Sequence, residues 1–137
     1  NFWNIAIKPG RPVALGNIFK KPFIGLPGNP VSVMITFIKI VLPTINKLSG
    51  HFLPIQNKFL VRTDFSFRKK KGRKEFLRVK IKTNANGEIK VTNYHNTGSG
   101  VFSSIVETDG LIELPENLTY LKKGTKIKFL SFSEVLI

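Results

Sequence analysis

One apolar segment with a sharply marked start most constrains what this chain can fold into. Between residues 30 and 48, apolar side chains recur at intervals of three and four, which is the spacing of a helix. Apolar residues also cover much of the remaining helix surface, so we expect this helix to be largely buried. Asn29 is a favourable N-cap and Pro30 falls at the first helical position. Pro43 should kink the helix.

The pattern changes on either side of this helix. Short apolar runs separated by Pro and Gly precede it and are typical of strands, at residues 5–7, 13–15 and 21–24. After it come short alternating segments joined by turns, the clearest at residues 75–83. An Asn-Gly hairpin signal follows that segment. The sequence therefore predicts an α/β part at residues 1–50, a linker at residues 51–57, and a β-rich domain of sheet or barrel type at residues 58–137.

Composition excludes several classes of site. The chain has 137 residues, no Cys and two His, so disulfides, thiolate metal sites and a Cys nucleophile are absent. Lys and Arg number 22 against 8 Asp and Glu, a formal net charge of +14. Residues 1–50 hold six of the basic side chains and no acidic one. The longest apolar run, residues 31–42, is interrupted by polar side chains and is shorter than the ~20 residues of a membrane span, so we expect no membrane segment.

The segment at residues 25–32 (GLPGNPVS) is the sharpest candidate for binding. A glycine-rich turn that opens a helix exposes unpaired amides beside the positive end of the helix dipole, which suits an oxyanion. Gly28 allows close approach of a ligand, and Ser32 can donate a hydroxyl hydrogen bond. An ordinary capped helix after a turn accounts for the same residues and is the more frequent reading of such a motif.

The segment at residues 8–12 (KPGRP) is a second candidate. Lys8 and Arg11 flank a rigid Pro-Gly turn at a strand end, where ligands of open α/β sheets bind. A solvated basic turn is the alternative. Two anion-binding loops within one small α/β unit favour the functional interpretation.

Two further segments carry weaker signals. Residues 98–104 place Gly98-Ser99-Gly100 before Ser104, which is either an anion nest or a small hinge. Residues 68–74 (RKKKGRK) could bind nucleic acid, although a solvated hairpin loop is the simpler interpretation, and no nucleic-acid-binding scaffold is recognised. No pair of carboxylates identifies a general acid and base or a metal site, so the catalytic residues stay unassigned.

These motifs, in this order and spacing, resemble the molybdopterin molybdenumtransferases, the family of bacterial MoeA and the E domain of gephyrin. The KPGRP and GLPGNPVS segments and the helix with Pro43 resemble the end of its third subdomain, a molybdopterin-binding-type α/β fold. Four later segments resemble its fourth subdomain, a small β-barrel-like domain. They are residues 97–100, Ser103-Ser104, residues 109–112 and Leu114-Pro115. The resemblance covers essentially the whole chain, which would be a C-terminal fragment that begins inside a domain.

The resemblance implies an activity. Family members insert molybdate into adenylylated molybdopterin with release of AMP, using Mg²⁺, as cytoplasmic homodimers. By match to the motifs, substrate or anion contacts would come from Lys8, Gly10, Arg11, Pro12, Gly28, Asn29, Ser32, Ser99 and Ser104. The family's upstream Gly-Gly-Val-Ser-Gly-Asp-type segment, with the acidic residues that serve the metal, is absent from this chain. We therefore expect the Mg²⁺ ligands to lie outside it and the fragment alone to be inactive.

Two other functions remain open at this stage. Gephyrin-like relatives hold receptor peptides with the C-terminal β-domain, so the chain could be an interaction or scaffold module. The net charge of +14 could also make the β-domain a nonspecific nucleic-acid-binding module, and we expect no sequence-specific nucleic acid as partner.

Overall fold

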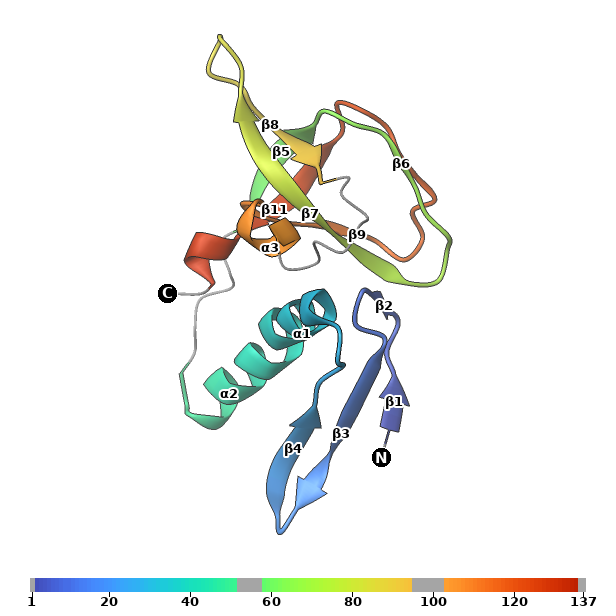
Figure 1. Ribbon diagram of the computed structural model, residues 1–137, viewed down its shortest axis with the longest axis vertical. Coiled ribbons are helices and arrows are strands. Elements are labelled where there is room, and N and C mark those ends of the chain that lie inside the picture. Colours follow the sequence, from blue (N-terminus) through green and yellow to red (C-terminus); the bar gives the residue numbers. More distant parts are fainter. Residues whose placement is uncertain (1, 52–57, 95–102, 136–137) are drawn as a thin grey trace. The chain divides into compact units, whose positions relative to one another are not determined.

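The computed structural model describes residues 2–51, 58–94 and 103–135 (Figure 1). Of residues 2 and 3 it describes the backbone only. The chain divides into two compact units, Asn1–Pro54 and Ile55–Ile137. This division falls within residues 51–57, the expected linker, of which residues 52–57 lie outside the described part.

The first unit combines a small antiparallel sheet with one long helix (Figure 1). The sheet has the order β1-β3-β4, and the short strand β2 is not part of it. Their bounds are β1 Phe2–Asn4, β2 Ile7–Lys8, β3 Pro12–Ile18 and β4 Lys21–Gly25. Val13 on β3 and the helix residues Val31, Ile35 and Ile38 are buried. The predicted α/β character of this part is therefore confirmed.

Strands β3 and β4 form one long hairpin where the sequence predicted two separate short strands. Ile18 pairs with Lys21, which leaves a two-residue turn of Phe19 and Lys20. Both turn residues have positive φ, 48° and 64°, the left-handed region that Asn and Gly favour in such turns. Each non-glycine residue in this region costs roughly 1–2 kcal/mol. The sequence lacks the usual turn residues, so nothing in the composition of residues 16–21 marked the hairpin.

The helix runs from Pro30 to Leu48 in three stretches: α1 Pro30–Thr36, a π-helical turn η1 Phe37–Val41, and α2 Leu42–Leu48. The amide of Leu42 donates to the carbonyl of Phe37, five residues back. This wide turn immediately precedes Pro43, which has no amide of its own and whose ring would crowd the carbonyl four residues earlier. The predicted disturbance at Pro43 thus takes the form of a π-turn.

By length and composition alone, this 19-residue helix could cross a membrane. The core helix of a soluble protein meets the same criterion. Val31, Ile35 and Ile38 are buried, whereas α2 has no buried residue, so the expectation of a largely buried helix is wrong for its second half. The expectation of no membrane segment stays a prediction.

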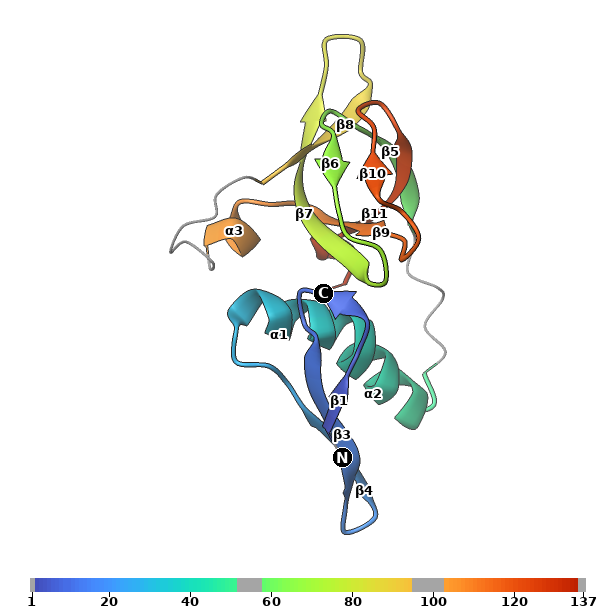
Figure 2. The same cartoon turned by 90° about the vertical axis from the view of Figure 1, so that its right-hand side faces the viewer.

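The second unit is a closed five-stranded β-barrel, as the β-barrel-like expectation proposed (Figure 2). Its strands follow the order β7-β8-β5-β11-β9, and β9 pairs with β7 to close the barrel. Only β5 and β8 run parallel. The bounds are β5 Phe59–Thr63, β7 Lys74–Thr83, β8 Ile89–Asn93, β9 Gly110–Leu114 and β11 Lys126–Ser131.

Smaller elements complete this unit. Strands β6 Phe67–Arg68 and β10 Tyr120–Leu121 pair as a two-stranded ribbon, which the sequence did not predict because both are only two residues long. Helix α3 spans Ser103–Val106 and a 3₁₀ turn, η2, spans Phe132–Glu134. The barrel interior is apolar and is formed by Val61, Leu77, Val79, Val91, Ile112, Leu114, Leu121 and Phe129.

Gly110 makes the closure of the barrel possible. It begins β9 and pairs with both Val79 of β7 and Ser131 of β11. A Cβ atom at this position would overlap the carbonyl oxygen of Leu130 and lie 2.6 Å from the ring of Phe129. Backbone atoms cannot yield as a flexible side chain can, so only glycine fits here.

We expect Gly110→Ala to destabilise the barrel by about 3 kcal/mol, the upper end of overpacking costs, because a backbone carbonyl must move. Gly16→Ala in β3 is the matched control, since a Cβ there meets nothing within 4 Å. Urea unfolding followed by circular dichroism measures both variants. Equal stability of the two would contradict this account of barrel closure.

Candidate functional site

The two motifs of the first unit lie against each other. Gly10, in the KPGRP turn, has a φ of 106° and is buried. A Cβ at Gly10 would come within 2.7 Å of Thr36 Cγ2 and 3.6 Å of the Ser32 carbonyl oxygen. The turn therefore packs directly onto the first turns of the helix, and the structure brings Gly10 and Ser32 together.

The KPGRP turn is closed by its own backbone. The amide of Ile5 donates to the carbonyl of Arg11 at 3.0 Å, and the Lys8–Pro9 peptide bond is cis. Lys8, Arg11 and Pro12 are exposed at this edge of the unit. Two exposed cations thus flank the turn that packs on the helix, and cations of this kind suit oxyanions.

Asn29 caps the helix, as its position in the sequence predicted. Its Oδ1 accepts hydrogen bonds from the amides of Val31 at 3.1 Å and Ser32 at 3.2 Å. These two amides are therefore already satisfied by the protein. Ser32 is buried, and Gly28 is exposed with open space where a Cβ would point. Ligand contacts by Gly28, Asn29 and Ser32 stay predictions.

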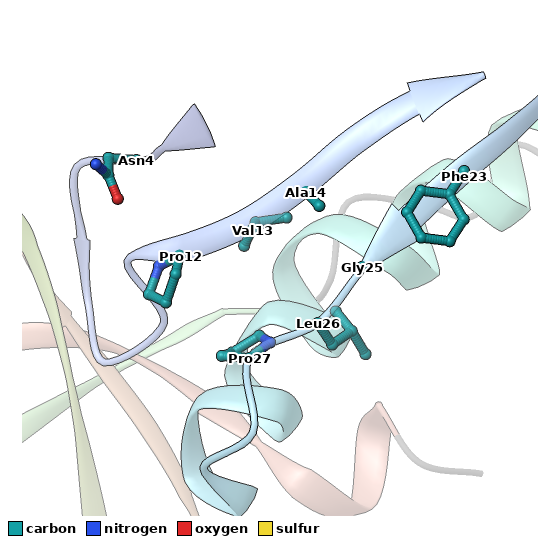
Figure 3. A pocket seen from close by; sticks show the side chains of 8 residues that line it. All are labelled: Asn4, Pro12, Val13, Ala14, Phe23, Gly25, Leu26 and Pro27. Atoms are coloured by element: carbon teal, nitrogen blue, oxygen red, sulfur yellow. The ribbon is translucent and has the colours of Figure 1, made fainter. Parts of the chain in front are cut away.

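A hollow of about 480 Å³ lies on the first unit beside these motifs (Figure 3). Both motifs contribute to its lining, Pro12 from the KPGRP turn and Gly25, Leu26 and Pro27 from the segment before the helix. The other residues of the lining are Asn4, Val13, Ala14 and Phe23. The surface of this hollow is mainly apolar, so it suits the uncharged, flat part of a ligand better than an anion.

In the second unit, Ser104 has a partner that the sequence did not reveal. Ser104 is completely buried at the start of α3, and Nη1 of Arg78 donates a hydrogen bond to its hydroxyl oxygen. Thr108 Oγ1 donates to the backbone carbonyl of Ser104 at 2.7 Å. Burial lowers the pKa of the Arg78 guanidinium. A half-buried cation held in place by a hydroxyl group is suited to contact an anionic ligand.

Arg78 was missed because it looks ordinary in the sequence. It alternates with Lys80 and Lys82 on the outward side of a predicted strand, and nothing in that pattern separates one cation from the others. Ser99, which was predicted with Ser104, lies outside the described residues.

Most of the described acidic side chains are engaged with partners in the protein. Asp64 pairs with Lys123 at 2.9 Å, and this partner holds the pKa of Asp64 below its usual value. Asp109 Oδ2 accepts from the amide of Ile81 at 2.7 Å. Within the described part of the chain, no three His, Cys, Asp or Glu residues gather as metal ligands would. These residues do not fit a Mg²⁺ site.

The basic run at residues 68–74 contributes to the structure of the loop that follows β9. Lys69 Nζ donates to the carbonyls of Pro115 and Leu118, each at 3.0 Å. Arg68 stacks over the ring of Tyr120 at 4.8 Å. Three of these charges therefore have structural tasks, since Lys74 also pairs with Glu113 at 2.9 Å.

Comparison with known proteins shows the family to which a chain with this small α/β unit and this closed barrel belongs. The family model of the MoeA C-terminal region (domain IV) matches residues 61–132. Over 95% of its length, the chain superimposes on the molybdopterin biosynthesis MoeA protein from Pyrococcus horikoshii with a TM-score of 0.78 and 31% identity, covering 31% of that structure.

Named relatives agree. The chain is 35% identical over 144 residues to the molybdopterin molybdenumtransferase of Haemophilus influenzae, covering 99% of this chain and 34% of that protein. It is 37% identical over 116 residues to the molybdenum cofactor synthesis protein cinnamon of Drosophila melanogaster, covering 81% of this chain and 18% of that protein. The chain belongs to the MoeA family of molybdopterin molybdenumtransferases, and it spans about a third or less of the length of these relatives.

We expect Ser104→Ala to lower the free energy of unfolding of the barrel unit by about 1–3 kcal/mol, because the half-buried Arg78 loses an acceptor. Arg78→Met in the same background should recover part of that loss, since no unpaired cation remains. Ser133→Ala, which alters an exposed hydroxyl, is the control and should stay within about 0.5 kcal/mol. If the stability losses of the Arg78 and Ser104 variants simply add in a double-mutant cycle, the energetic coupling of these two residues is refuted.

Proposed function

We propose that this chain forms the C-terminal part of an enzyme that inserts molybdate into adenylylated molybdopterin and releases AMP. The chain's relatives are molybdopterin molybdenumtransferases of molybdenum cofactor biosynthesis. The main support for the proposal is the contact of Gly10 with the helix at Ser32 and Thr36. This contact brings the two candidate oxyanion-binding motifs to the same edge of the first unit.

In this proposal the chain binds and orients the substrates. Lys8 and Arg11 hold oxyanions, either molybdate or the phosphate groups of the nucleotide, Arg11 as a planar fork and Lys8 as a point charge. Gly28 has no side chain that would block a ligand at the helix start. Pro12 lines the apolar hollow and directly follows Arg11 in the chain, so the hollow lies close to this cation. The hollow receives the flat organic part of the substrate, where burial of apolar surface adds affinity.

In this proposal, the catalytic acids and the metal ligands are supplied by residues outside this chain. The described residues do not fit a Mg²⁺ site, so no step is assigned here to a metal. We further propose that the active protein is a cytoplasmic homodimer and that the 137-residue chain by itself does not turn over substrate.

The test uses the protein produced from its own gene at its natural length. We expect Lys8→Ala or Arg11→Ala to lower kcat/KM for molybdate-dependent AMP release by about 30- to 100-fold, the equivalent of one or two charge-assisted hydrogen bonds. Lys47→Ala, an exposed cation in the last helical turn, is the control and should leave the rate unchanged.

Absence of AMP release from the natural-length protein would remove the proposed function. Turnover by the isolated 137-residue chain would instead show that the chain carries its own catalytic groups.

A groove on the barrel supports a second function, binding of an acidic peptide. It has a volume of about 520 Å³. Its apolar lining is formed by Leu60, Leu118, Leu121 and Ile127. Four lysines, Lys58, Lys74, Lys126 and Lys128, line it together with Glu113. Lys58 and Lys74 both pair with Glu113, at 3.4 Å and 2.9 Å, and this pairing raises the pKa of Lys74.

We expect a short fluorescent peptide with several Glu residues and one Phe to bind this groove. Replacing Lys126 and Lys128 by Glu should weaken the affinity about tenfold or more, because attraction becomes repulsion. Lys80→Glu combined with Lys82→Glu, two exposed changes on β7 outside the groove, is the charge-matched control. Fluorescence anisotropy measures the binding.

A DNA duplex added as competitor distinguishes the nucleic-acid alternative. Displacement of the peptide by any duplex, with a steep loss of affinity as salt rises, would assign the basic surface to nonspecific nucleic-acid binding.

A further inference from the structure

The tip of the β3–β4 hairpin exposes an apolar surface in the first unit. Phe19 is 95% exposed, Ile18 is 51% exposed and Phe23 is 45% exposed. We call these three residues the hairpin patch. Large apolar side chains gathered at the end of a projecting hairpin mark a contact surface more often than scattered single ones do.

The turn itself is made of unfavourable residues. Phe19 and Lys20 adopt positive φ, where Asn and Gly would fit without strain. A strained turn occupied by a large aromatic residue indicates that the side chain at position 19 serves something other than the stability of the hairpin.

Two of the three patch residues lie on one face of the hairpin. Residues that pair directly across two strands share a face, so Ile18 lies on the same face as Phe23. The opposite face carries Asn17 and Pro22 at the same level, and both are exposed. A tip inserted into a lipid surface would bury both faces, including the polar Asn17, whereas a partner polypeptide can pack on the face of Ile18 and Phe23 alone.

Charge selects the chemistry of that polypeptide. Lys20 and Lys21 directly follow Phe19, and residues 1–51 contain no acidic side chain that could neutralise them. A partner that packs on the hairpin patch therefore needs Asp or Glu beside its apolar residues. The same patch of a second copy would bring like charges together, which disfavours it.

The relatives indicate where such a segment is found. The chain covers 34% of the Haemophilus influenzae molybdopterin molybdenumtransferase and 31% of the Pyrococcus horikoshii structure. About two thirds of a family polypeptide is therefore available to contact the surfaces of this third. We propose that the hairpin patch is a docking surface for an acidic, apolar segment of a molybdopterin molybdenumtransferase polypeptide, taken from the part that this chain does not span.

Site-directed photocross-linking tests this proposal in the protein produced from its own gene at its natural length. Benzoylphenylalanine in place of Phe19 keeps an aromatic side chain at the tip. The same group in place of Asn17, on the opposite face, is the matched control. We expect a cross-link from position 19 to a family polypeptide at a segment rich in Asp or Glu, with a yield at least about tenfold above that from position 17.

The other outcomes overturn the proposal. A cross-link to anionic lipid would assign the tip to a membrane surface. A cross-link to the hairpin of a second copy, or to an unrelated protein, would refute the committed partner. Equal yields from positions 19 and 17 would show that the patch docks nothing.

A second variant separates docking from folding. Phe19→Asn with Lys20→Gly gives the turn its favoured residues, so the hairpin should be kept while the aromatic contact is lost. With the photocross-linker at position 18, this variant should give about a tenfold lower yield than the unmutated turn. An unchanged yield would refute the role of Phe19. AMP release, measured in parallel, reports on the proposed catalytic function independently of the cross-link.

Discussion

Close approach of backbones at glycine is the constraint on which each unit depends. In the first unit, Gly10 lets a Pro-rich turn lie on the helix at Ser32 and Thr36. In the second, Gly110 lets β9 meet both β7 and β11, so that five short strands form a barrel without an open edge. A side chain at either position would separate elements whose contact defines the unit. The shape of the candidate site depends on the contact of Gly10 with the helix.

The large positive charge is divided between structural and surface roles. Lys69 is fixed by three backbone carbonyls, Arg68 by an aromatic ring and Lys74 by Glu113. The run that looked most like a nucleic-acid-binding segment therefore shapes the loop after β9. Lys8 and Arg11, which stood out less in the sequence, are exposed on the turn that packs on the helix, and their contact with a ligand stays a prediction.

Much of the architecture could be predicted from the sequence because its signals are local. Asn29 and Pro30 marked the helix start, and the alternation at residues 75–83 marked the longest barrel strand. The β3–β4 hairpin could not be predicted, since Phe19 and Lys20 occupy a turn that normally carries Asn and Gly. The Arg78–Ser104 hydrogen bond joins residues 26 positions apart, and no local pattern encodes such a pairing. The motifs at residues 8–12 and 25–32 were recognisable, whereas their contact through Gly10 required the fold.

The one-sided charge of the first unit has a consequence for how its edge responds to acidity. Asp, Glu, His, Cys and Tyr are the side chains that ordinarily change charge below about pH 10, and residues 1–50 contain none of them. The positive edge formed by Lys8, Arg11 and the helix start therefore has no titrating neighbours within its own segment. If the proposed oxyanion binding holds, a pH dependence of that binding would have to originate in the ligand or in groups contributed from beyond this segment.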